Sequence, residues 1–423
     1  MLIYYFLSII FFTVIIIPVY LIAGLFRHDL ITRLMGFLKI YKLPVIEGKT
    51  IMFHGVSVGE IIAIEDLVKR AHVELPDHKI IVTAGTNTGK ELAENKFKDI
   101  AEQVLYFPPD FPPFINAFLK KTHPDAVIIA ETEIWPNFSY MVSRKNIPLF
   151  IINGRISDHS FKYYKHMSLF FGAIFDKTYT KILTQSEMDR QKFIKMGASP
   201  ETCEVMGNLK FDIEGKIPEE TLIEKGNSRI MIAGSTHKGE DEIVLQAFDK
   251  VHKNHPEFKL LLAPRHLTRL DEVTALVEKT GYKYDYYSKN TNFENCDIII
   301  LDVIGKLAKL YYFCDIAFLG GSFNKTGGHN PLEASIYNKP VISGPTISNF
   351  RGIYSALTTF NAGKVVKTPE EFEAEIFKLL EDNEYYNRVC QNCQKAFEQN
   401  RGAIDFVINK IKSKNGGGSN PHE

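Results

Sequence analysis

Two acids that follow a predicted strand have the residue types that acid–base chemistry requires. Residues 126–130 form a short apolar run, and Glu131 and Glu133 come directly after it. On an extended segment, residues two positions apart point to the same side, so both carboxylates are expected together at the strand end. Burying them is costly unless they are solvated or paired, which favours a general base or recognition of sugar hydroxyls. The alternative is an ion pair with an arginine such as Arg155.

Glu60 is a further candidate base, in a turn between a predicted strand and a predicted helix. Gly59 is one of two glycines in this turn, and glycine lets a substrate approach the backbone closely. Ser57 and Glu60 also match a capping box, in which the glutamate only satisfies a backbone N–H. The same pattern recurs at Thr368 and Glu371, where nothing chemical surrounds it. Capping alone therefore remains an alternative role for Glu60.

The second half of the chain contains a predicted anion site at a helix start. Asn330 suits the cap and Pro331 the first helical position, so together they predict where the helix begins. Free N–H groups at such a start, next to the paired glycines Gly327 and Gly328, leave room for a phosphate. Glu333, one turn further on, is expected to hold a ribose diol, to complete the Asn330 cap, or to do both.

Other loops that follow predicted strands of this half carry hydroxyl, cationic, imidazole and glycine groups. These residues are Ser235, Thr236, Arg265, His266, Gly321 and Ser322. Such groups at successive strand ends suit a nucleoside monophosphate better than a dinucleotide. The sequence has neither G-x-G-x-x-G nor G-x-x-x-x-G-K-[ST], which disfavours NAD-type and P-loop sites, and it has no H-E-x-x-H or aspartate-rich metal loop.

A segment between Arg155 and Lys181 alternates cations with large aromatic side chains. Lys162 and Lys165 lie among these aromatics. Cations beside large apolar rings suit a phosphorylated lipid presented at a membrane. A core helix with a solvated charged face is the alternative interpretation.

The elements that must position these residues are short apolar runs that alternate with amphipathic stretches, the pattern of a parallel sheet covered by helices. The rhythm lapses in the polar stretch 212–227, which predicts a domain boundary. Two consecutive doubly wound α/β domains would face each other across a cleft, where such folds bind ligands. The strands are expected at 51–53, 80–83, 104–107, 126–130, 149–152, 182–184, 205–206, 230–233, 260–263, 298–301, 316–319, 341–342 and 365–366.

Composition sets wider bounds. The 423 residues are 45% hydrophobic, enough for a core in each domain, which excludes intrinsic disorder. Fifty basic and fifty acidic residues give a formal net charge of zero, so the chain lacks the basic excess of a protein that coats nucleic acid. Five scattered cysteines indicate a reducing compartment. Cys390 and Cys393 are expected one turn apart on a helix and not in a metal site.

The N-terminal end predicts a membrane anchor. Residues 2–26 carry no charge, and about 20 apolar residues span a bilayer. A secretory signal peptide is disfavoured because no basic residue precedes the run and no cleavage site follows it. The segment 27–49 has a net positive charge and helical apolar spacing, which places the protein body in the cytoplasm and suits a helix on an anionic membrane surface. The glycine-rich tail 415–423 is expected to be flexible.

Taken together and in order, these motifs resemble the Kdo (3-deoxy-D-manno-octulosonic acid) transferases of lipopolysaccharide synthesis, over about residues 50–366. The motifs are S-V-G-E ending at Glu60, Tyr106-x-Pro108-x-Asp110, E-T-E-x-W-P-N from Glu131, Asn153-x-Arg155-x-Ser157, Gly207-x-Leu209-Lys210-Phe211-Asp212, S-T-H-x-G-E from Ser235, Pro264-Arg265-His266, and G-G-S…G-G-H-N-P-L-E-A ending at Ala334. This chain departs from the family at Asp302 to Leu307 and at Gly344-Pro345-Thr346, so contacts of those two loops are not carried over.

The resemblance implies a membrane-anchored, inverting glycosyltransferase of GT-B fold that moves Kdo from CMP-Kdo to a lipid A precursor, with no bound metal or cofactor, at the cytoplasmic side of the bacterial inner membrane. It implies that Glu60 is the base and that Glu131 is essential near the acceptor. It implies donor-site roles for Lys210, Ser235, Thr236, Arg265, His266, Gly321, Ser322, Gly328, Asn330 and Glu333. Acceptor contacts are expected from Ser57, Gly59, Arg155, Lys162 and Lys165.

The expected domains are an anchor (1–26), a basic segment (27–49), an acceptor domain (50–213), a donor domain (214–414) and the tail (415–423). A GT-B enzyme that uses a UDP-sugar, or a tethered nucleotide-binding scaffold without turnover, would share many of these features.

Overall fold

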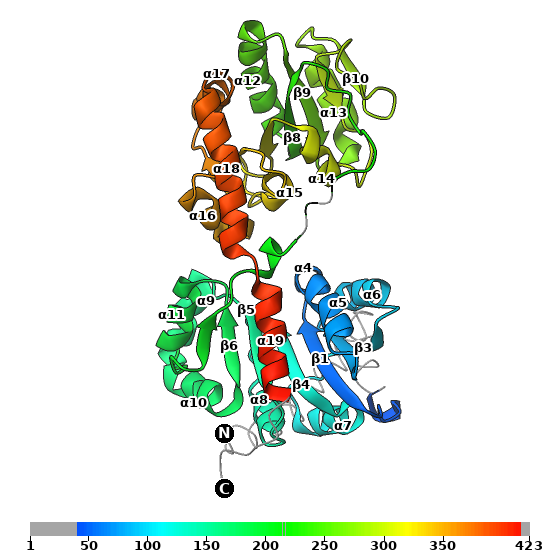
Figure 1. Ribbon diagram of the computed structural model, residues 1–423, viewed down its shortest axis with the longest axis vertical. Coiled ribbons are helices and arrows are strands. Elements are labelled where there is room, and N and C mark those ends of the chain that lie inside the picture. Colours follow the sequence, from blue (N-terminus) through cyan, green and yellow to red (C-terminus); the bar gives the residue numbers. More distant parts are fainter. Residues whose placement is uncertain (1–39, 214, 216, 416–423) are drawn as a thin grey trace, which may run out of the picture. The chain divides into compact units, whose positions relative to one another are not determined.

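The structure, a computed structural model, describes residues 40–213, 215 and 217–415, which fall into two compact units (Figure 1). Among the described residues, the first unit contains 40–212 together with the C-terminal segment 401–415, and the second unit contains 213, 215 and 217–400.

The first unit is a seven-stranded parallel sheet in the order β3-β2-β1-β4-β5-β6-β7. Its strands are β1 (Lys49–Gly55), β2 (His78–Ala84), β3 (Ala101–Tyr106), β4 (Pro124–Ala130), β5 (Leu149–Gly154), β6 (Lys181–Thr184) and β7 (Cys203–Val205). Its helices are η2 (Ile40–Lys42), α4 (Val58–Ala63), α5 (Glu65–Glu74), α6 (Asn87–Lys96), α7 (Pro112–Thr122), α8 (Pro136–Ser143), α9 (Asp158–Tyr164), η3 (Lys165–Met167), α10 (Ser168–Thr178), α11 (Glu187–Lys195), η4 (Leu209–Phe211) and α19 (Ala403–Asn415).

The second unit repeats this architecture with the order β10-β11-β9-β8-β12-β13-β14, again all parallel. Its strands are β8 (Arg229–Thr236), β9 (Phe258–Pro264), β10 (Tyr284–Tyr286), β11 (Ile298–Ile300), β12 (Ile316–Leu319), β13 (Val341–Ser343) and β14 (Gly363–Val365). Its helices are α12 (Glu240–Asn254), η5 (Leu267–Arg269), α13 (Leu270–Glu278), α14 (Leu307–Leu310), η6 (Tyr311–Phe313), α15 (Leu332–Ser335), η7 (Ser348–Phe350), α16 (Arg351–Thr359), α17 (Pro369–Glu381) and α18 (Asn383–Asn400).

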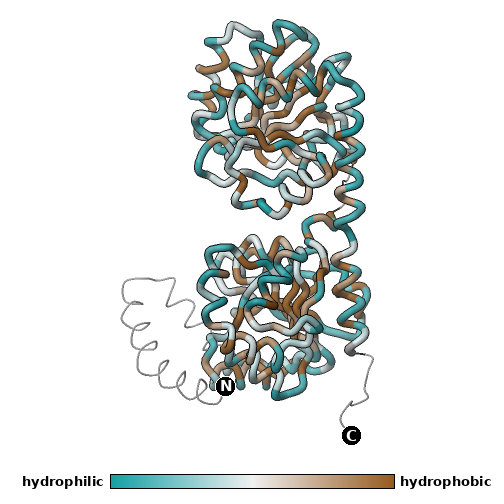
Figure 2. The backbone as a smooth tube through the Cα atoms, turned by 90° about the vertical axis from the view of Figure 1, so that its left-hand side faces the viewer, coloured by the Kyte–Doolittle hydropathy of each residue, from teal (hydrophilic) through white to brown (hydrophobic). Residues whose placement is uncertain are grey.

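Each sheet is buried on both faces, as continuous apolar strands predict. In β1, Met52 packs into one core cluster, whereas its neighbours Ile51 and Phe53 pack into the cluster on the opposite face. In Figure 2, which colours the chain by residue hydropathy, the hydrophobic residues are concentrated inside each unit. The predicted pair of doubly wound parallel-sheet domains is therefore confirmed, while the predicted cleft between them stays a prediction.

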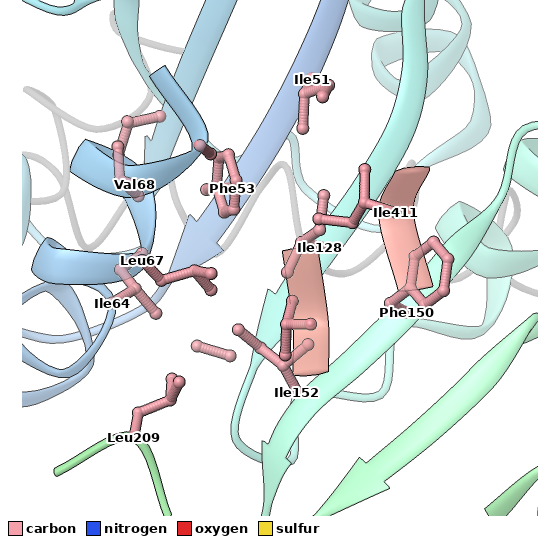
Figure 3. Packing of buried hydrophobic residues seen from close by; sticks show 14 of the residues in the cluster. Ile51, Phe53, Ile64, Leu67, Val68, Ile128, Phe150, Ile152, Leu209 and Ile411 are labelled. Carbon is pink, nitrogen blue, oxygen red and sulfur yellow. The ribbon is translucent and has the colours of Figure 1, made fainter. Parts of the chain in front are cut away.

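The C-terminal helix α19 belongs to the first unit, which corrects the predicted donor domain of 214–414. Ile411 of this helix packs in the same cluster as Ile128 and Phe150 (Figure 3). The Asp212 carboxylate accepts hydrogen bonds from the N–H groups of Gly402 and Ile404, where α19 begins. Sequence periodicity finds an apolar helix face but not which of two similar cores it covers.

Smaller differences concern element boundaries. The strand β10 was not predicted, because its three residues are only partly buried and form no apolar run. The helix expected after Glu60 is divided at Ile64 into α4 and α5. Asn415, predicted to open the flexible tail, ends α19, and the remaining tail residues lie outside the described chain. Cys390 and Cys393 lie on α18 as free thiols, as predicted.

The predicted membrane anchor, residues 1–26, also lies outside the described residues, as does most of the basic segment 27–49. Within the described ranges, no helix combines the length and hydropathy needed to span a bilayer.

Candidate active site

Glu60 lies at the carboxyl end of β1, on the first turn of α4, and its carboxylate is held on both oxygens. The Val56 N–H donates to Oε2 at 2.6 Å, and the Ser57 hydroxyl donates to Oε1 at 3.0 Å. The carboxylate is thus fixed by its own turn. The capping alternative is realised in part, because Glu60 does satisfy a backbone N–H ahead of the helix.

The second capping box shows how Glu60 differs from a purely capping glutamate. Glu371 accepts from the Lys367 N–H at 2.8 Å, and the Thr368 hydroxyl accepts from the Glu371 N–H at 3.3 Å. At Glu60 the serine hydroxyl turns instead to the carboxylate and makes no cap to the helix. Glu371 is exposed, whereas Glu60 is half-buried. The resemblance to a capping box therefore hides a carboxylate in a different environment.

Three carboxylates lie close enough at this sheet edge to affect one another. Burial raises the pKa of Glu60 above its ordinary value, and the charge of Glu131 adds to the effect. Burial raises the pKa of Glu133 to about 7, with further contributions from Glu60 and Glu131, which the nearby Trp135 indole partly offsets. Like charges in a partly dry site hold on to protons, which is the environment that tunes a general base.

Glu131 directly follows β4 in a backbone conformation that non-glycine residues rarely adopt, with φ of 57°. Asn153 at the end of β5 and Ser235 at the end of β8 share this left-handed conformation. Such strained residues persist where the surroundings hold them, and they cluster at functional sites. The left-handed conformation could not be predicted at these three positions, because glycine, the residue that most often signals it, is absent from all of them.

Two cations accompany the acids in the first unit. Burial lowers the pKa of Lys210, the charge of Arg155 lowers it further, and Glu131 opposes both effects. Lys210 is expected to neutralise charge on the donor from a position next to the domain boundary. It lies on η4 near Glu131 and Arg155, in the first unit as the predicted domain 50–213 has it, and its contact with the donor stays a prediction.

Asp110 is a positioning residue whose role the sequence did not reveal. Its carboxylate accepts from the N–H groups of Asn137 at 3.1 Å and Phe138 at 2.8 Å, so it caps the start of α8. Burial raises its pKa to about 6. The loop after β3 is thereby joined to the loop that carries Glu131 and Glu133. Aspartate is a frequent cap, but its helix lies in another part of the sequence.

The other predicted acceptor contacts are accessible. Ser57 is half-buried, and Gly59, Arg155, Lys162 and Lys165 are exposed. Lys162 on α9 and Lys165 on η3 flank Tyr163, which is 64% exposed, and Leu169 nearby on α10 is 93% exposed. Phe171 and Phe175 of α10 are buried in the core instead. The buried rings agree with the core-helix interpretation, whereas binding of a phosphorylated lipid by the exposed face stays a prediction.

In the second unit, Glu240 organises the site, although it was not among the predicted residues. Its Oε2 accepts from the N–H groups of His237 at 2.9 Å and Gly321 at 2.6 Å. Its Oε1 accepts from Ser322 at 2.8 Å and Phe323 at 2.9 Å. This buried carboxylate ties the loop after β8 to the loop after β12. The motif S-T-H-x-G-E contains the residue, but nothing local indicates partners 80 positions away.

This arrangement corrects the predicted donor contacts of Gly321 and Ser322, because Glu240 already occupies both of their N–H groups. The Ser322 hydroxyl donates to Leu319 O at 2.6 Å and accepts from the Gly344 N–H at 2.8 Å, and the residue is fully buried. The side chain of Thr236 is also buried and donates to Asp241 at 2.6 Å. These residues position the loops instead of facing a ligand.

The remaining predicted donor residues surround the same loops. Arg265 and His266 are exposed, and Asn330 is half-buried. Burial raises the pKa of Glu333 and the charge of Arg265 opposes it, so these two side chains are neighbours. Gly328 has a φ of 78°, and its N–H donates to Gly321 O at 2.7 Å.

The predicted helix at Asn330 is shorter than expected. Its side chain caps the Leu332 N–H at 3.2 Å, as an Asn-Pro start predicts, but α15 ends at Ser335. A single turn has little macrodipole, so charge at this site depends more on Arg265 than on the helix. Among the residues that the structure describes, no group of His, Cys, Asp and Glu side chains is arranged to hold a metal ion.

Comparison with known proteins assigns both units to families of glycosyltransferases. Residues 31–213 match the family of 3-deoxy-D-manno-octulosonic-acid transferases, and residues 216–396 match the glycosyl transferases group 1. Among solved structures, UDP-GlcNAc 2-epimerase from Neisseria meningitidis has the same fold, with a TM-score of 0.60 and 15% identity over 86% of this chain and 100% of that one. The two Rossmann-like units give a GT-B-like fold, and the two family matches define the class as glycosyltransferase.

Two named relatives indicate which glycosyltransferase family the chain belongs to. The 3-deoxy-D-manno-octulosonic acid transferase of Haemophilus influenzae is 32% identical over 92% of this chain and 91% of its own length. A bifunctional glycosyltransferase/methyltransferase of Fusobacterium nucleatum is 35% identical over 86% of this chain, which spans 57% of that longer protein. The chain therefore belongs to the Kdo transferase family and is a glycosyltransferase.

Proposed function

We propose that the protein transfers Kdo from CMP-Kdo to a lipid A precursor, with inversion at the anomeric carbon and without a metal ion. The observation that carries this proposal is the carboxylate of Glu60, oriented by Ser57 and Val56 and half-buried beside Glu131 and Glu133. The sugar is inferred from the Kdo transferase relatives. The loops of the second unit support a nucleoside monophosphate, and the cytidine base is inferred from the family resemblance.

The proposed reaction is a single displacement. Glu60 accepts the proton of an acceptor hydroxyl as the hydroxyl oxygen bonds to the anomeric carbon of Kdo. The bond from that carbon to the phosphate oxygen breaks, and its electron pair leaves with CMP. Attack from the face opposite the leaving group inverts the centre. Because Ser57 and Val56 already fix the carboxylate, little ordering is needed at the moment of reaction.

Charge on the departing phosphate needs a partner. Arg265 is exposed on the loop after β9, and Glu333 beside it is available for a ribose diol. A pre-set cation that meets charge as it develops stabilises the transition state more than the ground state, and removing one such donor costs about 3 kcal/mol. Cationic side chains in this role can replace a divalent metal.

The acceptor is proposed to bind the first unit. Arg155, Lys162 and Lys165 suit the phosphates of the lipid, while exposed Tyr163 and Leu169 suit the apolar part of a membrane surface. With an anchor at residues 1–26, the enzyme and its acceptor would share the cytoplasmic leaflet of the inner membrane, which raises their effective concentration.

The experiment is mass spectrometry of products formed by purified full-length protein, CMP-Kdo and a tetraacylated, bisphosphorylated glucosamine disaccharide. The expected product is heavier by one or more Kdo residues. NMR of its anomeric centre reports inversion, and activity after treatment with a chelator tests metal independence. Thermal stabilisation by UMP but not by CMP would instead favour a UDP-sugar donor, and CMP binding without any product would favour a scaffold.

A further inference from the structure

Two histidines of the second unit meet in a way that no motif indicated. His237 follows β8, His329 precedes α15, and their Nε2 atoms lie 3.0 Å apart. The ring planes differ by 11° and the centroids are 5.3 Å apart. That separation equals the nitrogen–nitrogen distance plus one ring radius on either side, so the rings lie edge to edge. This is the geometry of an in-plane hydrogen bond.

This contact limits the protonation states of the pair. One Nε2 must carry a proton and the other must offer its lone pair, because two protonated nitrogens repel. The ring whose Nε2 accepts must then carry its own proton on Nδ1. The pair therefore shares one central proton, and a further proton would make both outer nitrogens donors. The pair would then carry a positive charge and present one N–H donor on the outer side of each ring, so either ring can donate to an anion.

The surroundings keep this pair neutral while no anion is present. Burial lowers the pKa of His329 to about 4, and burial also lowers the pKa of His237. Arg265 and His266 disfavour a charge on both rings. Around His237, Arg269 acts in the same direction, and only Glu240 opposes it. Desolvation and neighbouring cations are the two effects that an arriving phosphate would reverse.

The backbone holds the pair rigidly inside the predicted donor loops. The N–H of His237 donates to the buried carboxylate of Glu240, which also ties down Gly321. A side chain at Gly321 would bring its Cβ to 3.1 Å from the His329 ring, so the imidazole packs against that loop. His237 follows Thr236, and His329 lies between Gly328 and Asn330, all residues of the predicted donor site.

We propose that His237 and His329 bind the nucleotide phosphate of the donor as a proton-sharing pair, which takes up one proton from solvent when the phosphate binds. The cationic pair then stabilises the departing CMP and returns the proton when CMP dissociates. No bond to the sugar is made or broken by either ring. This inference rests on the proposed use of a cytidylate donor.

The test is isothermal titration calorimetry of the full-length protein with the methyl phosphodiester of CMP, whose single charge does not titrate near neutral pH. Titrations at pH 5.5 and 7.5, each in two buffers of different ionisation enthalpy, give both the affinity and the number of protons bound. Because the bound pair holds its proton to higher pH than the free pair, affinity must rise as pH falls. We expect binding at least about threefold tighter at pH 5.5, with proton uptake.

Each single variant, His237→Gln or His329→Gln, keeps the other titratable ring of the pair, so the decisive variant replaces both histidines by glutamine. This double variant keeps two hydrogen-bonding amides and should bind the diester without proton uptake or pH dependence. His72→Gln, which removes an exposed imidazole on α5 of the other unit, should behave as wild type. Nitrogen NMR of histidine-labelled wild-type protein gives a measurement that does not depend on the variants folding. It should show imidazolium signals that appear only with the diester.

Binding without proton uptake by the wild type, or uptake that persists in the double glutamine variant, would overturn this inference and leave the proposed function intact. Failure to bind the CMP diester, with binding of its uridine counterpart, would refute the proposed donor and this inference with it.

Discussion

Replacing Glu240 by glutamine tests how the donor loops are held together. Each carboxylate oxygen accepts two backbone N–H groups, Oε2 from His237 and Gly321 and Oε1 from Ser322 and Phe323. In Glu240→Gln, the amide oxygen can keep one of these two sets. The amide nitrogen is itself a donor and faces the other set.

Two N–H groups then lose their acceptor in a buried place. Each such loss costs about 1–3 kcal/mol, so the variant should lose about 2–6 kcal/mol of the free energy of unfolding. This is a large share of the about 5–15 kcal/mol that stabilises a typical domain. The second unit should also bind CMP more weakly, because Glu240 joins the loops after β8 and β12.

The single tryptophan makes the assay selective. Trp135 lies in the first unit, so its fluorescence reports unfolding of that unit, whereas far-UV circular dichroism reports both units. In a urea titration, Glu240→Gln should move a circular dichroism transition to lower urea and leave the tryptophan transition unchanged. The control is Glu371→Gln, the same change in the same unit at a carboxylate that accepts from a single exposed backbone N–H, which the amide oxygen can still satisfy. A Glu240→Gln transition that coincides with that of the control would refute the reasoning.

Three further predictions concern other buried contacts. The pKa of the Glu133 carboxyl is higher in the folded than in the unfolded protein, so its contribution to the free energy of unfolding falls as pH rises from 4.5 to about 7. Chemical denaturation at several pH values should therefore show Glu133→Gln gaining stability relative to wild type across this window. A difference that stays constant with pH would contradict the raised pKa of Glu133. Asp110→Ala removes the hydrogen-bond acceptor at the start of α8 and should lower the free energy of unfolding of the first unit, measured by tryptophan fluorescence, by about 1–2 kcal/mol. Transfer activity should fall as well. Unchanged activity would show that the loop with Glu131 and Glu133 keeps its position without this cap. Gly234→Ala would place a Cβ at 1.8 Å from the Tyr311 hydroxyl, so it should destabilise the second unit in circular dichroism, and Tyr311→Phe should partly rescue it; absence of rescue would locate the clash elsewhere.

The sequence predicted the fold well because its signal is local. Most strands buried on both faces contain an uninterrupted apolar run, as at residues 126–130, and each of the thirteen predicted runs overlaps a strand. The exceptions lack such a signal. The strand β10 has no apolar run, and α19 has an apolar face that fits either core until the Asp212 contacts fix its place.

The candidate site was predicted less completely, because its contacts join distant parts of the chain. Loop positions followed from strand ends, so Glu60, Glu131 and Arg265 could be named in advance. The roles of Asp110 and Glu240 depend on backbone N–H groups that only the folded chain brings to them.

The pairing of His237 with His329 is of the same kind, since it joins loops after the neighbouring strands β8 and β12. Lys210 was placed next to the domain boundary by its position in the sequence, and it lies on η4, in the last turn of the first unit. Its neighbours Glu131 and Arg155 could not be predicted in the same way, because they come from other parts of the chain.

The central claim is that Glu60 removes the acceptor proton, and steady-state transfer by Glu60→Gln in the full-length protein tests it most directly. The glutamine can still accept from the Val56 N–H and so keeps the cap, but it cannot take a proton. We expect kcat to fall by about 10²–10⁴ with the affinity for CMP unchanged. Turnover close to that of the wild type, in a variant that binds CMP normally, would leave Glu60 with only its capping role.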